Sequence, residues 1–137
     1  MTPTLLGRWQ TRLLLFLTVG VVLTWPFATA IEGQFFAVLF WIMFLGFFWD
    51  CLYTLIQKFR WDRDWPAAYQ VVAGIWEAFF LLSIIISFGL FGSYFGDFSV
   101  FWFVIHYSTV WLGIFLASQV LMRLLFPRWR FRGGRWF

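Results

Sequence analysis

The sequence predicts an all-α membrane protein, a bundle of four transmembrane helices joined by short loops. Hydrophobic residues make up 63% of the 137 residues and charged residues only 12%, whereas a soluble domain has about 45–50% and about 25%. The apolar residues also fall into four continuous runs, each close to the roughly 20 residues that a helical span requires. A membrane-spanning barrel would need alternating segments of about ten residues, and the sequence has none.

Each apolar run predicts one helix, and the runs are separated by polar or turn-forming residues. The first break is Glu32-Gly33-Gln34, the second extends from Lys58 to Trp65, and the third contains Gly92, Gly96 and Asp97. Pro66 suits the first turn of a helix and Pro127 closes the last one. The expected spans are residues 13–30, 35–57, 66–91 and 98–125, within one domain (1–126) followed by a basic and aromatic tail (127–137).

The positions of the cations predict the orientation of the bundle. All ten lie before the first run, between the second and third, or at the end of the chain: Arg8, Arg12, Lys58, Arg60, Arg63, Arg123, Arg128, Arg130, Arg132 and Arg135. Because Lys and Arg near span ends stay on the cytoplasmic side, both termini are expected in the cytoplasm. We expect a multi-pass protein of a bacterial inner membrane or a thylakoid-type membrane.

The N-terminal segment also matches a second pattern. Arg8 and Arg12, the apolar stretch after them, and the small residues Ala28-Thr29-Ala30 together resemble a signal peptide with its cleavage site. Cleavage would leave three helices. We expect the segment to be kept as the first of four.

Two acidic residues fall inside expected spans, where ionisable groups usually mark a pathway, a partner contact or a structural pair. At about 1.5 Å per residue, Asp50 lies roughly 12 Å from Lys58, and Glu77 lies roughly 15–18 Å from the start of the third span. An antiparallel pairing of these two spans therefore brings Asp50 and Glu77 to one depth. It also places Tyr53 beside Gly74, and Gln57 beside Gln70.

Helical spacing places these polar residues on facing stripes of the second and third spans. The candidate intramembrane polar site, for a proton or a cation, comprises Asp50, Glu77, Tyr53, Gln57 and Gln70. Small residues permit close packing of membrane helices, and Gly46 and Gly74 are the candidates here.

Two interpretations of the carboxylates remain open. Two carboxylates at one depth in a low-dielectric medium cannot both stay ionised unless a cation or an arginine joins them. One interpretation is therefore a proton or cation pathway. The other is a structural contact, either between the second and third spans or with another subunit.

The fourth span contains the single histidine and a ridge of small residues. His106 is a candidate axial ligand for a porphyrin or chlorin, with the many aromatic residues as apolar walls, and the alternative is a hydrogen bond to a neighbouring helix. Thr109, Gly113 and Ala117 recur at spacings of four and are expected to pack against another helix, internal or foreign. The cofactor is unknown; a bound lipid or pigment fits this composition.

The end of the chain alternates arginine with aromatic residues. Such a juxtamembrane segment is expected to bind anionic lipid head groups, since each cation contributes roughly 1 kcal/mol and the rings insert into the interface. Docking on an acidic partner is the alternative, and nucleic acid is not expected beside a bilayer. The arginines involved are Arg123, Arg128, Arg130, Arg132 and Arg135.

The residue inventory argues against an enzyme. Cys51 is the single cysteine, which excludes the cysteine pairs of quinone-linked disulfide enzymes and four-thiolate zinc sites. A single histidine excludes a bis-histidine haem within one chain. Small multidrug exporters need a carboxylate in the first span, and residues 13–30 contain none. Neither a catalytic triad nor a metal cluster nor a phosphate loop is present, so we expect no enzymatic activity.

Two hypotheses of function remain. The first is an accessory or structural subunit of a larger membrane complex, in contact with pigment or lipid, whose partners are other membrane subunits or further copies of this chain. The second is a small transporter or channel component with its proton or cation site at Asp50 and Glu77.

Overall fold

The computed structural model describes residues 2–31, 34–90 and 99–136. Within these ranges the chain is all-helical, without strands, and four helices are long and apolar enough to cross a membrane. They are Leu5–Ala30, Gln34–Phe59, Ala67–Phe88 and Val100–Leu125. The expectation of an all-helical chain with four helices long and apolar enough to span a membrane is therefore confirmed for the described residues. The expected loop residues Glu32, Gly33, Gly92, Gly96 and Asp97 lie outside the described residues.

The first and fourth spans each contain a short π-helical turn. The first consists of α1 (Leu5–Leu15), the π turn η1 (Phe16–Gly20) and α2 (Val21–Ala30); the fourth consists of α5 (Val100–Leu116), the π turn η2 (Ala117–Leu121) and α6 (Met122–Leu125). The second and third spans are α3 (Gln34–Phe59) and α4 (Ala67–Phe88). A π turn inserts one extra residue into the helix and locally changes where side chains point, often at functional sites.

The first helix begins eight residues before the expected start of its span, at Leu5. The hydroxyl of Thr4 caps it by accepting a hydrogen bond from the Gly7 N–H at 3.2 Å. Arg8 and Arg12 therefore lie inside the helix, one turn apart on the same face. The apolar run alone could not show this, because the two arginines interrupt it.

The described ends of α4 and α5 follow common capping rules. Gly89 ends α4 in the left-handed conformation (φ +58°), and its N–H bonds to the Ile85 carbonyl, as is frequent for glycine at a helix C-terminus. The hydroxyl of Ser99 accepts from the Trp102 N–H at the start of α5.

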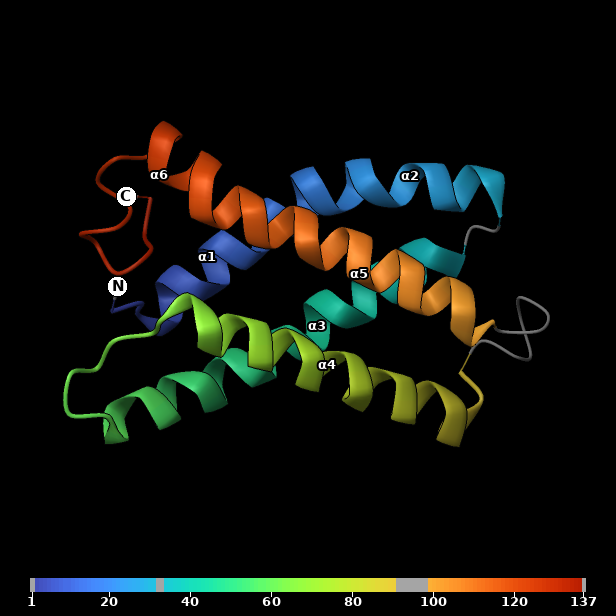
Figure 1. Ribbon diagram of the computed structural model, residues 1–137, viewed down its shortest axis with the longest axis horizontal. Coiled ribbons are helices and arrows are strands. Elements are labelled where there is room, and N and C mark those ends of the chain that lie inside the picture. Colours follow the sequence, from blue (N-terminus) through green and yellow to red (C-terminus); the bar gives the residue numbers. More distant parts are fainter. Residues whose placement is uncertain (1, 32–33, 91–98, 137) are drawn as a thin grey trace.

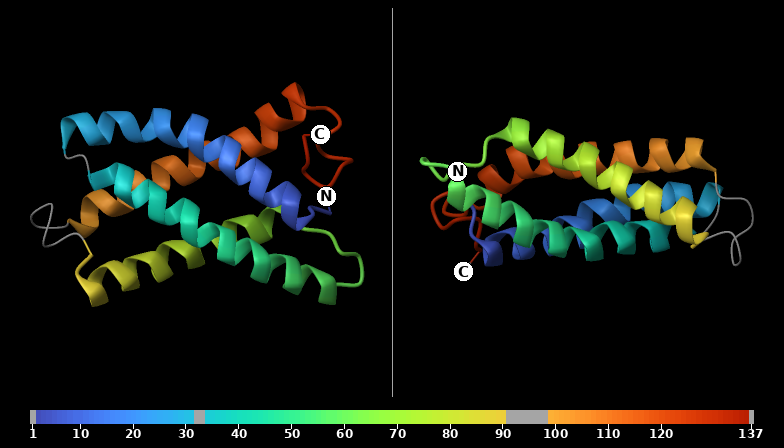
Figure 2. Two further views of the ribbon diagram at one scale, coloured as in Figure 1. Left: turned by 180° about the vertical axis from the view of Figure 1, so that it is seen from behind. Right: turned by 90° about the horizontal axis from the view of Figure 1, so that it is seen from below.

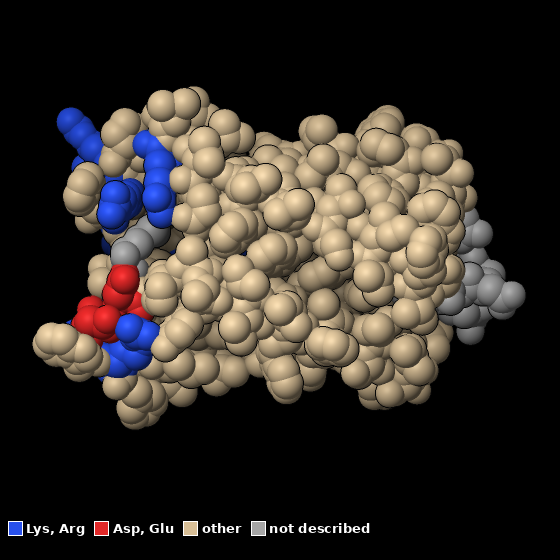
Figure 3. Space-filling model, in the orientation of Figure 1, with Lys and Arg blue, Asp and Glu red and all other residues tan. Residues whose placement is uncertain are grey.

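The two chain termini and the α3–α4 connection lie at the same end of the bundle (Figures 1 and 2). The charged residues visible on the face in Figure 3 gather at this end, and the rest of that face is uncharged among the described residues. We call it the cation-rich end. Its assignment to the cytoplasm remains a prediction of the positive-inside rule.

The two halves of the bundle are packed differently. Away from the cation-rich end, large apolar side chains fill the interior; Val38, Leu81 and Phe103 are each no more than 2% exposed. Toward the cation-rich end the interior also buries charged and polar side chains such as Asp50 and Gln57, and we call this the polar half. A smaller apolar cluster lies in the same half and consists of Leu15, Ala117, Met122 and Trp129. Among the four spans, α4 buries the smallest share of its residues, so it is the most peripheral helix.

Candidate functional site

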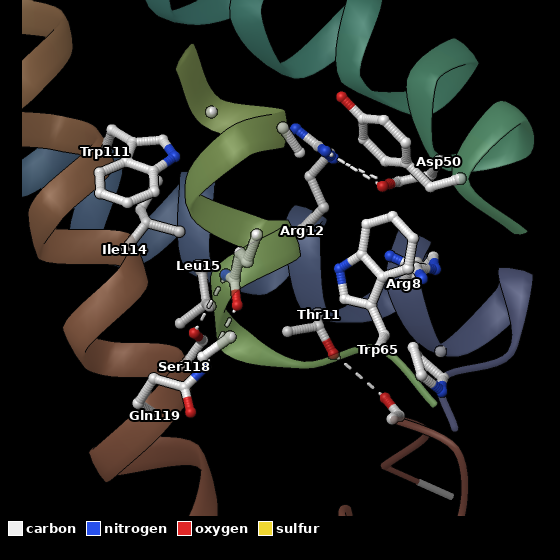
Figure 4. Close-up of a pocket in the computed structure, with 18 of the residues that line it drawn as sticks. Arg8, Thr11, Arg12, Leu15, Asp50, Trp65, Trp111, Ile114, Ser118 and Gln119 are labelled. Carbon is white, nitrogen blue, oxygen red and sulfur yellow. Dashed lines mark hydrogen bonds and ion pairs between the residues drawn. The ribbon is translucent and has the colours of Figure 1, made fainter. Parts of the chain in front are cut away.

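Three charged side chains from three helices meet in the polar half of the bundle. Arg12 of α1 lies between Asp50 of α3 and Glu77 of α4. All three are largely removed from solvent, with side-chain exposures of 14%, 5% and 11%. Figure 4 shows the Arg12 and Asp50 side chains pointing toward each other. We call these three residues the ion cluster.

Arg12 binds its two carboxylates unequally. Its Nε and Nη2 donate to the two Asp50 oxygens at 2.8 and 3.0 Å, a close bidentate geometry typical of strong pairs. Its Nη1 and Nη2 reach Glu77 at 3.4 Å each, near the outer limit for a hydrogen bond. The Tyr53 hydroxyl donates to Glu77 Oε1 at 3.1 Å. Asp50 is therefore firmly held, whereas Glu77 is the more exchangeable carboxylate.

Gly46 makes room for the guanidinium group. A Cβ atom at this position would overlap the Nη1 and Cζ atoms of Arg12. The glycine expected to allow close helix packing thus allows a buried arginine to lie against α3. On its other side, the Arg12 guanidinium lies 5.7 Å from the centre of the Phe16 ring.

Arg8 connects α1 to the α3–α4 connection. Its Nη2 donates to Gln57 Oε1 at 2.9 Å, and its guanidinium stacks 4.4 Å from the centre of the Trp65 ring. Gln57 in turn donates to the Arg63 carbonyl at 2.7 Å. The Nε atom of Arg8 is buried and has no hydrogen-bond partner.

The structure brings only part of the expected α3–α4 pairing together. Asp50, Tyr53 and Glu77 do meet, although Arg12 joins the carboxylates. Gln70 does not approach Gln57; it bonds Ser118 at 3.3 Å and Gln119 at 3.1 Å, both in η2. The side chain of Gln70 therefore lies toward the fourth span and not toward α3.

Gly74 also faces α5 and not Tyr53. The Tyr107 hydroxyl donates to the Gly74 carbonyl at 2.7 Å. A Cβ atom at Gly74 would overlap the indole of Trp111. This glycine therefore lets two aromatic side chains of α5 lie directly against the α4 backbone.

A cavity of about 350 Å³ contains the ion cluster, which is within the range of small-molecule sites. Its walls come from all four spans, and it reaches the cation-rich end, where Pro3, Asp64 and Arg130 line it. The charged residues that line it are Arg8, Arg12, Asp50, Asp64, Glu77, Arg123 and Arg130. With all of these ionised, the lining carries one net positive charge.

The C-terminal tail folds back onto the start of α1. The Trp129 indole is buried and donates to the Thr11 hydroxyl at 2.8 Å, and the Thr4 N–H donates to the Gly133 carbonyl at 2.8 Å. Gly7 is essential to this fit, because a Cβ atom there would overlap Gly133. We call this contact the terminal clamp. Arg128, Arg130, Arg132 and Arg135 remain exposed around it.

An ion pair organises the α3–α4 connection near the cavity mouth. The Arg60 side chain donates to both carboxylate oxygens of Asp62, at 2.8 and 3.0 Å. These hydrogen bonds lower the pKa of Asp62 to about 2 and raise the pKa of Arg60. Asp62 therefore remains a carboxylate throughout the physiological pH range.

His106 is enclosed in the apolar half of the bundle. The residue is 0% exposed, its Nε2 lies 3.0 Å from the Thr24 hydroxyl, and its ring packs against Phe27 and Phe35 at centroid distances of 5.1 and 4.9 Å. The two phenylalanine rings therefore occupy part of the space around the imidazole. The contact to Thr24 corresponds to the alternative considered above, a hydrogen bond between helices.

The expected small-residue ridge of the fourth span is divided between the interior and the surface. Ala117 is buried, and a Cβ atom at Gly113 would overlap Leu23 of α2. Thr109 is exposed, and its hydroxyl donates to the Ile105 carbonyl within α5. Only Thr109 is therefore available to a neighbouring chain.

The contacts of Arg12 with Asp50 and Glu77 are not predicted from the sequence, in which Arg12 serves only to predict the orientation of the bundle. The available signal was the four-residue spacing of Arg8 and Arg12, which places both on one face if the helix starts early enough. With the guanidinium between the carboxylates, the position that a metal cation would take is already occupied by positive charge. The arrangement leaves Glu77 as a carboxylate with only longer contacts, beside an open cavity.

Comparisons of the chain with models of protein families, with curated protein sequences and with solved structures found no match. The function must therefore be inferred from the chemistry of the cavity and of the bundle surface.

Proposed function

We propose that this chain is a small transporter component of the membrane, with the ion cluster as its substrate-binding and proton-exchange site. The observation that carries the proposal is the position of the ion cluster in a 350 Å³ cavity that reaches the cation-rich end. Buried ionic groups that serve only to hold helices together need no cavity beside them.

The unequal hydrogen bonding indicates how the site would work. Asp50 and Arg12 form a fixed pair, while Glu77 is held by three longer contacts. A proton or a charged substrate group that reaches Glu77 can replace the Arg12 contact at small cost. Because Glu77 lies on α4, the most peripheral span, the same exchange would loosen or tighten α4 against α1.

Proton flux in liposomes tests this proposal. Purified protein is reconstituted with a pH-sensitive dye inside the vesicles, and a pH gradient is imposed. We expect internal acidification to be faster than in protein-free vesicles and to slow to their rate with Glu77→Gln. Asp62→Asn is the matched control, because it neutralises a carboxylate outside the cavity, and it should leave the flux unchanged. A wild-type flux equal to that of protein-free vesicles would contradict the proposal.

A second proposal is that the chain is an accessory or structural subunit of a larger membrane complex. The observation that favours it is the outer face of α5, where the small polar residues Ser108 and Thr109 are exposed and permit close approach of another helix. Thr109→Leu thickens this face without touching the interior. In native gels this variant should migrate at lower mass than wild type, and a wild-type protein that already runs as a monomer would exclude the subunit role.

A further inference from the structure

An apolar crevice of about 420 Å³ runs along the outer side of the bundle between α4 and α5. Its walls on α4 extend from Val71 to Leu82 and include Ile75 and Phe79. From the first to the last of these twelve residues the helix rises about 16 Å along its axis, at about 1.5 Å per residue. One leaflet of a bilayer has a hydrocarbon thickness of about 15 Å, half of the roughly 30 Å core. The crevice thus has the length of one acyl chain.

The crevice and the cavity share a thin wall. Gly74, Tyr107 and Trp111 line both spaces. This wall consists of the hydrogen bond from Tyr107 to the Gly74 carbonyl and of the Trp111 indole lying on Gly74. A molecule in the crevice therefore lies directly beside the interior that contains the ion cluster.

The charge at the cation-rich end complements an anion. Arg123 and Arg130 line the cavity and are exposed. Arg8 lines the same cavity, and its buried Nε has no hydrogen-bond partner. As noted above, the full lining carries one net positive charge. The cations at the bundle end lie where a lipid has its head group, and the apolar walls of the crevice lie toward the bilayer centre, where a lipid has its acyl chains.

We propose that the cavity and the crevice together form a binding site for one anionic phospholipid from the leaflet at the cation-rich end. One acyl chain lies between α4 and α5, and the phosphate group lies at the cavity mouth near Arg123 and Arg130. The inference rests on the proposed function, because it names the substrate class of the same cavity. It differs from general attraction of lipid to the tail, since Arg128 and Arg132 do not line the cavity.

Native mass spectrometry of the full chain in neutral detergent tests the site. The probes are phosphatidylglycerol and phosphatidylcholine with identical palmitoyl and oleoyl chains. We expect one phosphatidylglycerol to be retained per chain, in preference to phosphatidylcholine, and not to be displaced by inorganic phosphate. Equal retention of the two lipids, or displacement by phosphate alone, would overturn the inference. This comparison uses the wild-type protein and does not depend on the folding of any variant.

Two pairs of variants test where the lipid head group and the acyl chain bind. Arg123→Gln with Arg130→Gln should weaken retention of phosphatidylglycerol about tenfold or more, given roughly 1 kcal/mol for each cation. Arg128→Gln with Arg132→Gln removes the same charge from outside the cavity and should leave retention unchanged.

Ser108→Trp fills the crevice and should abolish the preference for phosphatidylglycerol over phosphatidylcholine. Thr109→Trp adds the same bulk beside the crevice and should leave that preference unchanged. Equal effects within either pair would show surface attraction or annular lipid only, and would contradict the site.

The same preparations separate this inference from the proposed function. Retention of one phosphatidylglycerol without proton flux would support the lipid site and contradict the transporter. Flux that depends on Glu77, without preference for the anionic lipid, would support the transporter and contradict the lipid site.

Discussion

At the residue scale, Arg12 determines what the two intramembrane carboxylates can do. It holds Asp50 through two hydrogen bonds of 2.8 and 3.0 Å and Glu77 through two of 3.4 Å. An arginine has five N–H donors in a planar fork and can serve both carboxylates at once, which a lysine cannot do with the same geometry. Both carboxylates are therefore part of the folded interior, and Glu77 is the more loosely held of the two.

Because Arg12 binds Asp50 more closely than Glu77, neutralising Asp50 should destabilise the protein more than neutralising Glu77. Asp50→Asn breaks the close buried pair and should lower the free energy of unfolding by about 3–5 kcal/mol. Glu77→Gln removes weaker contacts and should cost about 1–2 kcal/mol. The double variant should lose more than the sum, because Arg12 then has neither carboxylate. Denaturant unfolding in detergent, followed by circular dichroism, measures all three. Equal single effects that add would show that Arg12 does not couple the two residues.

Gly46 offers an independent test of the same arginine. Gly46→Ala places a methyl group in the position of the Arg12 guanidinium, and should destabilise the protein by about 2 kcal/mol or more, since the charge loses its partners. Gly113→Ala is the matched control, because the same methyl meets only the flexible end of the Leu23 side chain. It should change the thermal midpoint of unfolding much less. Equal losses of stability in the two variants would show that a methyl group at Gly46 does not displace Arg12.

At the element scale, the terminal clamp joins the first and last parts of the chain. Gly133 has a positive φ of +62°, and a side chain there would also press on Thr4. The tail that the sequence predicts as a membrane-surface segment is thus a folded element, with its arginines outside and Trp129 inside. Head-group binding by those exposed arginines remains a prediction.

The clamp predicts protection of the tail from proteolysis. Gly133→Ala should release it, because a left-handed conformation costs a side-chain-bearing residue about 1–2 kcal/mol. Cleavage by trypsin after Arg130 and Arg132 should then be about five to thirty times faster, as the open population rises. Phe131→Ala, at a side chain that is 86% exposed, should leave the rate unchanged. Similar rates for wild type and Gly133→Ala would mean that the tail is not held.

The sequence predicted the four helical spans better than it predicted the side-chain contacts between them. The four apolar runs predicted the spans because hydrophobicity along the chain is a local property. The Arg12 contacts depend on a helix start set by Thr4 and on the space left by Gly46, which no single run of residues reveals. Likewise depth and helical spacing predict Gln70 beside Gln57, and its contact with Ser118 instead follows from the packing of α4 against the fourth span.

At the scale of the whole molecule, the described cations occur at the start of α1, at the end of α3 and in the connection after it, and from α6 onward. These segments lie at the end that holds both termini (Figure 1). This predicts cytoplasmic termini. With Cys51→Ala as background, Arg132→Cys should be protected from a membrane-impermeant thiol reagent in intact cells, while Glu32→Cys should react. Lysis should make Arg132→Cys reactive, which controls for burial of the residue. Labelling of Arg132→Cys in intact cells would reverse the orientation.

The position of Arg12 in the first span has a consequence for biosynthesis. Ribosomes deliver α1 to the membrane before α3 and α4, so Arg12 enters before either of its carboxylate partners has been made. The first helix has 26 residues and is about 39 Å long, which exceeds the hydrocarbon core by about 9 Å. This extra length allows the nascent helix to keep Arg12 at the level of the lipid head groups, where its charge is hydrated. Completion of the third span then supplies the second carboxylate, and synthesis of the segment with Trp129 and Gly133 allows the terminal clamp to form on the first turn of α1. The site is therefore completed only after the fourth span has been made.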